Sequence, residues 1–332
     1  MIRKLLIGLI AVVAVLAVVG LILPRHVQVK RAIAIDRPAS LVYAVVNSFV
    51  LFPKWSPWQD LDPNMAQSAE GPRDGVGAKL IWKGNDKVGS GTQTITVSTP
   101  NQSIASDLDF GDMGVAKSLV ALVPEGTSTT VTWTVDVDMG ANPIGHYFGL
   151  TMDGMLGKDF ANGLGKLKAL VESIPNTDIA GFSVEAVELK AMPILAVSES
   201  TTPDAIAKAY TDGFAQIMKF MTKNKLHPAG AVLGIGGEMA GSNFQFDAAI
   251  PVDRGDTQSA DGVRSLQSYA GKALKTIHVG AYEGLAKTYA QLHAYIAAHG
   301  YVAKGPLISS FIDDPGNTPV DKVRTEVYAP VE

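Results

Sequence analysis

The strongest constraint on the fold of this chain is an apolar run of nineteen residues, Leu5 to Leu23, that contains no charged side chain. Read as a helix at about 1.5 Å per residue, the run is about 28 Å long, which matches the hydrocarbon core of a bilayer. A cleaved signal peptide is the alternative, but the run is long for one and no A-x-A-like cleavage site follows it. We therefore predict an uncleaved transmembrane anchor within residues 1–26.

The basic residues that flank the apolar run are divided almost evenly between its two sides. Arg3 and Lys4 precede it, and Arg25, Lys30 and Arg31 follow it, so the positive-inside rule gives little guidance. The short N-terminal tail favours an orientation in which the tail stays in the cytoplasm. We expect a single-pass protein of the cell membrane, with the lipid bilayer as a partner and with its domains outside the cytoplasm.

Composition excludes several kinds of site. The chain has no cysteine, so disulfides, thiol nucleophiles and thiolate metal sites are ruled out. The six histidines show no ligand spacing of the HExxH kind, and we predict neither a metal nor a cofactor. A net charge of −4 provides no basic surface, so we expect no nucleic-acid partner.

The rest of the chain is predicted to be α+β. Apolar and polar residues alternate from Val27 to Ile35, a short helix follows Pro38, and short alternating runs from Val76 to Asp138 predict antiparallel hairpins. A long helix is predicted from about Tyr147 to Glu172. Its apolar stripe comprises Phe148, Met152, Leu156, Phe160, Leu164, Leu167 and Val171.

This order of elements carries a resemblance. With "WSPWQDLDPN", "GVGAKLIWKGN", "GSGTQTIT" and "GTSTTVTWTVD", the first domain, residues 27–175, resembles the START-like or polyketide-cyclase-like (SRPBCC) helix-grip family. The resemblance implies a cavity between the sheet and the long helix that accepts a small hydrophobic molecule. Trp55, Trp82 and Trp133 are then candidate ligand-binding residues.

An internal repeat marks the second domain, residues 182–332. "AIAKAYTDGFAQI" and "GLAKTYAQLHAYI" share one stripe at a constant offset, and "FQFDAAIPV" matches "VRTEVYAPV" at the same offset. Two copies of a strand, helix, strand, strand unit are predicted to form a pseudo-twofold pair. In this alignment Glu326 falls on the position of Asp247, so both copies have a carboxylate at the same place.

"IHVGAYEGLAKTYAQLHAYI", "GPLISSFIDDP" and "TEVYAPV" resemble the GyrI-like effector-binding family in their order. Members of that family sense lipophilic, often cationic compounds, and some hydrolyse strained electrophiles. The resemblance assigns the family's central acid to Glu326 and its aromatic "GxY" residue to Tyr282. Ala281 stands where proline is usual, which leaves the turn before Tyr282 less constrained.

The residues support a site independently of the family. A carboxylate in a groove costs several kcal/mol unless it is paired, so Glu326 is available for a cation or for proton transfer. Tyr282 and Tyr328 would add cation–π attraction of roughly 0.5 to 2 kcal/mol each. The alternative is that Glu326 simply pairs with Arg324 or with an exposed lysine at a sheet surface.

The function that follows is a membrane-anchored protein that binds small lipophilic, possibly cationic, molecules through Glu326, Tyr282, Tyr328 and Asp247. The rival hypothesis is a detoxifying hydrolase in which Glu326 acts as general base and Tyr282 orients the substrate. A protein-interaction module is a weaker alternative, because a membrane anchor separates this chain from a cytoplasmic partner.

Overall fold

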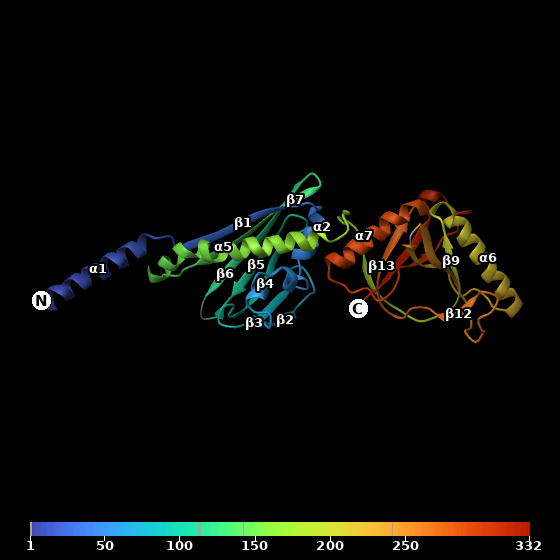
Figure 1. The fold of residues 1–332 in the computed structure, drawn as a ribbon, viewed down its shortest axis with the longest axis horizontal. Coiled ribbons are helices and arrows are strands. Elements are labelled where there is room, and N and C mark those ends of the chain that lie inside the picture. Colours follow the sequence, from blue (N-terminus) through green and yellow to red (C-terminus); the bar gives the residue numbers. More distant parts are fainter. Residues whose placement is uncertain (1, 112–113, 142, 241) are drawn as a thin grey trace. The chain divides into compact units, whose positions relative to one another are not determined.

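A computed structural model of the protein describes residues 2–111, 114–141, 143–240 and 242–332. The chain begins with helix α1 (Ile2–Ile22), most of whose side chains are exposed. The chain divides into two compact units. The first comprises the residues up to 180, α1 included, together with residues 298–300, and the second comprises the remaining residues (Figure 1). Residues Arg3–Ile22 are long and apolar enough to cross a membrane.

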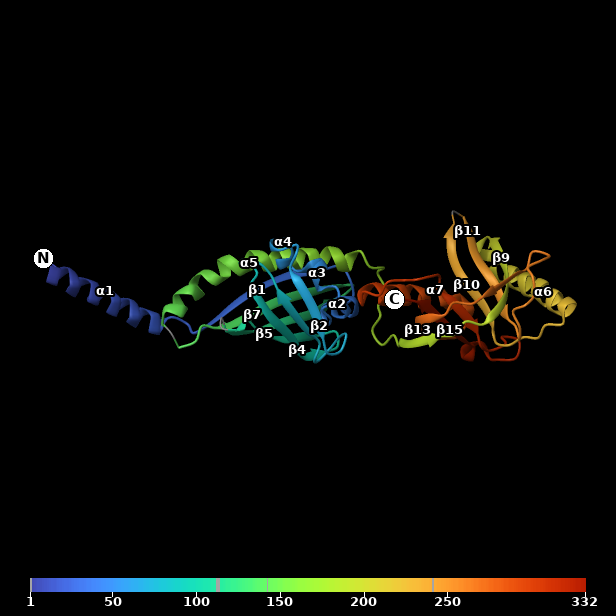
Figure 2. The same ribbon diagram turned by 90° about the horizontal axis from the view of Figure 1, so that it is seen from below.

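The first domain is an antiparallel sheet with one long helix, as the alternating strands and the helical stripe predicted. Its elements are β1 (His26–Ile35), α2 (Ala39–Val46), α3 (Phe52–Trp55), α4 (Trp58–Leu61), β2 (Ala66–Glu70), β3 (Lys79–Lys83), β4 (Ser90–Thr99), β5 (Ser103–Asp109), β6 (Val115–Glu125), β7 (Ser128–Asp138) and α5 (Pro143–Glu172). The seven strands pair in the order β1-β7-β6-β5-β4-β3-β2. Figure 2 shows α5 lying across one face of this sheet.

An aromatic layer fills the space between α5 and the sheet. The ring of Phe160 stacks on Trp133 with centroids 4.2 Å apart, and Trp58 meets both rings edge-on. Trp55 packs edge-on against Trp133, and Trp55 and Trp133 are only 4% and 3% exposed. Aromatic pairs of this kind stabilise a core beyond the area that they bury.

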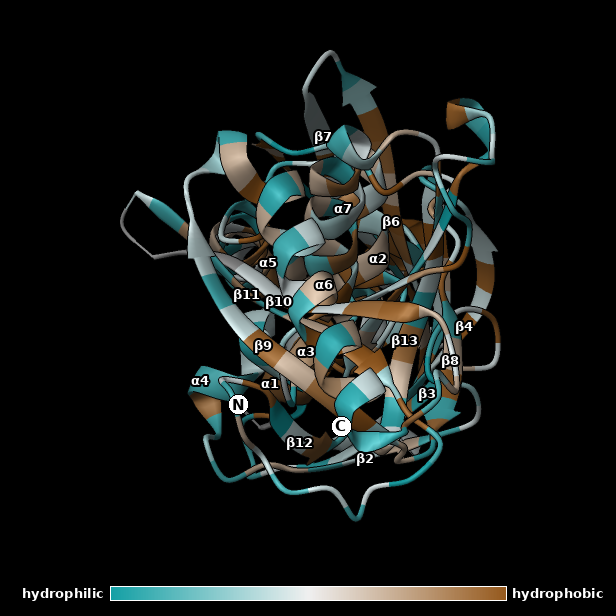
Figure 3. Ribbon diagram, turned by 90° about the vertical axis from the view of Figure 1, so that its right-hand side faces the viewer, coloured by the Kyte–Doolittle hydropathy of each residue, from teal (hydrophilic) through white to brown (hydrophobic). Residues whose placement is uncertain are grey.

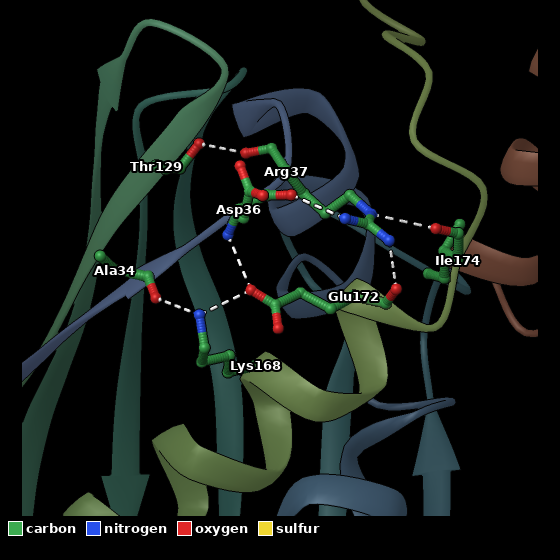
Figure 4. Close-up of polar contacts among 7 residues, drawn as sticks. All are labelled: Ala34, Asp36, Arg37, Thr129, Lys168, Glu172 and Ile174. Carbon is green, nitrogen blue, oxygen red and sulfur yellow. Dashed lines mark hydrogen bonds and ion pairs between the residues drawn. The ribbon is translucent and has the colours of Figure 1, made fainter.

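Polar contacts fix the C-terminal end of α5 to the start of the domain (Figure 4). Arg37 donates from Nε to the carbonyl oxygen of Ile174 at 3.0 Å and from Nη2 to that of Glu172. Lys168 donates to the carbonyl oxygen of Ala34 at 2.8 Å and to the Glu172 carboxylate at 2.6 Å. Because the last carbonyls of a helix have no partner within it, these contacts satisfy groups that would otherwise need water.

The second domain is a single curled antiparallel sheet with two helices. Its elements are β8 (Glu185–Leu189), β9 (Pro193–Thr201), η2 (Pro203–Ala205), α6 (Ile206–Asn224), β10 (Val232–Ala240), β11 (Asn243–Pro251), β12 (Arg264–Gln267), β13 (Gly271–Val279), η3 (Tyr282–Gly284), α7 (Leu285–Ala298), β14 (Ile308–Phe311), η4 (Val320–Lys322) and β15 (Arg324–Pro330). Figure 3 shows that β9 has both a hydrophilic and a hydrophobic stretch. Its residues from Ile194 to Val197 are apolar and buried throughout, so both faces of the sheet carry apolar side chains.

The strand order shows how the two predicted copies combine. It reads β12-β9-β11-β10-β14-β15-β13-β8, which is symmetric about the pairing of β10 with β14. Gly234 lies opposite Ser309 at this centre. The sequence did not predict the outermost strands: β8, which precedes the first copy, pairs with β13 of the second, and β12 pairs with β9 of the first. Each copy thus supplies an edge strand to the other.

Both helices pack on one face of this sheet, which we call the helix face. Ile217 of α6 is buried with Leu195 and Ile250, and Leu292 of α7 is buried with Val327. Residues that alternate with these point to the opposite face, which we call the inner face. Its apolar members form a separate small cluster: Ile194, Ala196, Leu233, Ala249 and Ile308, with Ile235, Tyr269 and Tyr328 against it.

Two glycines of α5 allow a matched test of the aromatic layer. A Cβ atom on Gly163 would lie 2.9 Å from Pro57 Cδ and 3.1 Å from Trp133 Cζ3, whereas one on the exposed Gly165 would meet nothing within 4 Å. We predict that Gly165→Ala raises the free energy of unfolding of the first domain by about 0.5 to 1 kcal/mol, because alanine favours the helix. Gly163→Ala should lower it, because overpacking outweighs that gain.

All four tryptophans lie in the first domain, so their emission during urea unfolding of the full chain in micelles reports on this domain alone. An equal gain in stability for both alanine variants would contradict the packing described here.

Candidate functional site

The two repeat-related acids both lie on the inner face, each on the last strand of its copy. Asp247 pairs across the sheet with Ser198 and Ile235, and Glu326 pairs with Ile277 and Ser310. Residues directly opposite each other in a ladder project to the same side. The prediction that the repeat places two carboxylates equivalently therefore agrees with the strand register.

Each acid forms an ion pair with a basic residue of another strand: for Glu326 this is the adjacent β13, and for Asp247 it is β12, on the far side of β9. Lys275 Nζ of β13 is 2.6 Å from Glu326 Oε1, and Tyr328 donates its hydroxyl hydrogen to Glu326 Oε2 at 2.5 Å. Arg264 Nη2 of β12 is 2.7 Å from Asp247 Oδ2, and Ser198 donates to Asp247 Oδ1 at 2.7 Å. Sequence reasoning missed Lys275, Arg264 and Ser198.

The sequence left open whether Glu326 simply pairs with Arg324 or with an exposed lysine. Arg324 does not hold Glu326; its guanidinium forms two hydrogen bonds with Asp313, at 2.8 and 2.9 Å. The acid pairs instead with Lys275, and both side chains are largely sheltered, at 21% and 23% exposure. This ion pair is therefore neither an exposed surface pair nor an unpaired buried carboxylate.

Hydrogen bonding controls the ionisation of this cluster. Burial acts to raise the pKa of Glu326, but the hydrogen bonds from Lys275 and Tyr328 outweigh it, and the net pKa is lowered. Burial, followed by the nearby carboxylate, raises the pKa of Tyr328 well above that of an ordinary phenol. Glu326 is thus held ionised and Tyr328 is held protonated.

The aromatic ring of Tyr328 already has a cation beside it. Lys275 Nζ lies 5.8 Å from the ring centroid, within the range of a cation–π contact. The acid and the aromatic face predicted for a ligand cation are therefore both in contact with a cation of the protein itself.

Tyr282 lies on the other side of the sheet from the two acids. Its ring meets Phe311 edge-on at 5.3 Å, and Phe311 packs with the α7 cluster on the helix face. Phe311 alternates with Ser310, the direct neighbour of Glu326, so the strand separates the two side chains. The turn before Tyr282 is held by His278, whose Nε2 is 2.9 Å from the carbonyl oxygen of Ala281.

A groove of about 250 Å³ opens beside the acids on the inner face. Its lining comprises Ile194, Ile235, Asp247, Leu266, Gln267, Ser268, Tyr269, Lys304, Gly305, Pro306, Ile308 and Pro330. Glu326 is outside this lining, but Tyr328 is the cross-strand neighbour of Ile308. An apolar groove with a few placed polar groups is the usual form of a small-molecule site.

The predicted cavity of the first domain is almost filled by its own side chains. A residual space of about 20 Å³ remains, lined in part by Trp55 and Trp133, and this is room for about one water molecule. Trp82 packs against Phe110 with centroids 5.8 Å apart. Trp55 and Trp133, predicted to line a ligand cavity, are core residues here because the aromatic layer occupies that space.

Comparison with known proteins identifies both domains. Residues 26–172 match the family model described as polyketide cyclase / dehydrase and lipid transport, and residues 182–332 match the GyrI-like small molecule binding domain. No curated protein matches the chain. The chain thus joins an SRPBCC-like domain to a GyrI-like domain, in the order that the sequence motifs predicted.

Three solved structures that resemble parts of this chain are each 16% identical to it. A chain of the EcmrR–DNA complex is 16% identical, with a TM-score of 0.42, over 57% of this chain and 72% of its own. A hydrolase from Listeria innocua is 16% identical, with a TM-score of 0.35, over 45% of this chain and 92% of its own. The protein SAV2435 bound to tetraphenylphosphonium is 16% identical, with a TM-score of 0.33, over 45% and 94%.

The ionisation of Glu326 predicts a pH dependence of stability. Because its pKa is lower in the folded than in the unfolded chain, the carboxylate stabilises the fold above the ordinary glutamate value of about 4.3, and this contribution is lost as pH falls through the folded-state pKa. Glu326→Gln should cost the second domain about 1 to 2 kcal/mol at pH 7. The difference from wild type should shrink in acid.

Hydrogen exchange of the β15 amides measures this in the full chain, with the exposed Glu188→Gln as the control. A difference between wild type and Glu326→Gln that stays constant from pH 7 to pH 3 would contradict the lowered pKa.

Proposed function

We propose that this chain captures small lipophilic molecules at a membrane surface. The premise is that residues 182–332 form a GyrI-like small molecule binding domain. The inner-face groove is the binding site and α1 is the anchor, with both domains outside the cytoplasm. The observation that carries the proposal is the groove itself, which combines an apolar lining with the carboxylate of Asp247.

Apolar contact supplies most of the affinity in this proposal. The groove is lined by Ile194, Ile235, Leu266 and Ile308, and burial of apolar ligand surface contributes about 25 cal/mol per Å². The two nearby acids contribute little net charge, because Arg264 and Lys275 already neutralise Asp247 and Glu326. Lipophilicity therefore ranks ligands more strongly than charge does.

A cationic ligand competes with the protein's own lysine. Lys275 occupies both the carboxylate of Glu326 and the ring of Tyr328, which are the two features that would attract a lipophilic cation. Such a ligand gains full electrostatic attraction only by displacing the ammonium group. The wild-type protein should discriminate weakly between a cation and a neutral molecule of the same shape.

Hydrolysis is the second candidate, and the short contact between Tyr328 and Glu326 favours it. A carboxylate beside a phenol near a groove could activate water. The direction of the pKa shift argues the other way, because Lys275 and Tyr328 hold the acid ionised and make it a weaker base. Binding without reaction is therefore the function that the cluster supports best.

Filling the groove tests the binding site. We predict that Ile235→Trp weakens binding of neutral lipophilic aromatic compounds to the full chain in micelles by at least tenfold, about 1.4 kcal/mol, because the larger side chain occupies ligand space. Val279→Trp, at a residue 58% exposed on β13, is the control. Titration calorimetry gives the affinities, and mass spectrometry of the recovered compounds gives their chemical state.

Unchanged affinity in Ile235→Trp would remove the groove from the proposal. A compound that gains one water molecule with the wild type but not with Glu326→Gln would replace binding with hydrolysis as the function.

Removing the internal cation tests the ligand preference. We predict that Lys275→Met raises affinity for tetraphenylphosphonium at least tenfold relative to a neutral compound of the same shape, because it frees the carboxylate of Glu326 and the ring of Tyr328. The double variant with Glu326→Gln should lose that gain. Lys272→Met, on the same strand but facing the other side of the sheet, is the matched control. Equal changes in affinity for the cation and for the neutral compound would refute the claim that Lys275 competes with a cationic ligand.

A further inference from the structure

The first turns of α5 carry an apolar surface on the side away from the sheet. Ile144, Phe148 and Met155 are 66%, 67% and 67% exposed, and at about 100° per residue they fall on one side of the helix. We predicted that Phe148 belongs to the buried stripe of this helix, but the first large apolar side chain of α5 that is buried is Phe160. An outward helical face in water is normally polar, so this surface requires another explanation.

The orientation of these turns is fixed by the opposite side of the helix. Asp153 accepts hydrogen bonds from Arg31 of β1 at 2.8 and 3.1 Å. A Cβ atom on Gly149 would lie 2.5 Å from Val27 Cγ2, so the helix backbone approaches β1 closely. Asp153 is the only acidic or basic residue other than histidine between 143 and 157, and it faces the sheet. Phe148 and Met155 therefore face outward by geometry.

The same turns of α5 lie against the end of α1. Tyr147 donates its hydroxyl hydrogen to the carbonyl oxygen of Leu16 at 2.7 Å, and His146 Nδ1 is 2.6 Å from the carbonyl oxygen of Gly20. A Cβ atom on Gly20 would meet Pro143 at 2.8 Å, which shows how closely the helices approach. Figure 2 shows the start of α5 beside the end of α1. The apolar surface of α5 is thus continuous with that of the helix suited to cross a membrane.

We propose that the first four turns of α5 form a second membrane contact, lying in the interfacial region of the bilayer that α1 spans. The proposal rests on the membrane anchoring proposed above. Its apolar side chains, Ile144, Phe148 and Met155, would sit at the boundary between headgroups and acyl chains, as in amphipathic helices that lie on a bilayer. The occupant is lipid because the surface continues the exposed side chains of α1.

The neighbouring charges indicate that this contact is apolar in origin. Arg25 forms two hydrogen bonds with Asp138, both at 2.6 Å, and Arg31 is engaged by Asp153. These two arginines are neutralised by carboxylates of the chain itself, whereas Lys158, at the C-terminal edge of the surface, is exposed. The contact should therefore form on zwitterionic bilayers and should resist high salt.

The absence of cysteine makes a direct test possible. Single variants Phe148→Cys and Met155→Cys of the full chain, labelled with the fluorophore NBD, are placed in phosphatidylcholine vesicles whose acyl chains carry bromine as a quencher. Leu9→Cys reports on insertion of α1. Ala169→Cys, an exposed position near the far end of α5, and Thr127→Cys, in the exposed β6–β7 turn, report on water. Unchanged tryptophan emission verifies the fold of each variant.

The expected result is at least twofold quenching by brominated lipid at positions 148 and 155, as at position 9, with none at 169 and 127. The quenching should persist in these zwitterionic vesicles at high salt. Quenching at position 9 without quenching at 148 and 155 would overturn the inference and leave the anchor intact. No quenching at position 9 would refute the anchoring itself. Protection of 148 from aqueous iodide that grows with protein concentration, without lipid quenching, would assign the surface to a second copy and also overturn the inference.

Discussion

The pairing of β10 with β14 is the interaction on which the second domain depends. It joins two copies of one unit into a continuous eight-stranded sheet, with Gly234 opposite Ser309 at the centre. A Cβ atom on Gly234 would lie 2.3 Å from the hydroxyl of Tyr210, while Tyr289, the equivalent residue of the second copy, is hydrogen-bonded to Ser309 at 2.7 Å. Because both helices pack on the helix face, the inner face is left to form a groove.

The symmetry of that sheet is broken in a way that matters for function. Asp247 and Glu326 occupy equivalent positions, but the inner face around them differs. Beside Glu326 stand Tyr328 and Lys275, whereas their equivalents in the first copy are the fully buried alanines Ala249 and Ala196. Large polar groups therefore fill one end of the inner face, and space remains toward the other, where Asp247 lines the groove.

How much of the fold and of the candidate site could be predicted from the sequence depends on how far apart in the chain the interacting residues lie. The repeat and the alternation along each strand were enough to place Asp247 and Glu326 on one face, since both signals are local. Lys275 could not be predicted as the partner of Glu326, because its equivalent in the first copy is Ala196 and its position beside Glu326 is set by the pairing of β13 with β15. Tyr282, predicted beside the acids, lies on the helix face for the same reason: only the assembled sheet shows which side a turn approaches. In the first domain the stripe of α5 was predicted, but not that its first turns extend past the packed layer and leave Phe148 exposed.

Photoaffinity labelling tests the central claim, that the inner-face groove of the second domain holds a small lipophilic molecule. A lipophilic aromatic diazirine is photolysed with the full chain in micelles, with and without an excess of unlabelled competitor, and the labelled peptides are identified by mass spectrometry. The account predicts competable labelling on β10, on β14 and around Leu266, the segments that line the groove. Competable labelling around Trp133 of the first domain, with none in the groove, would contradict it.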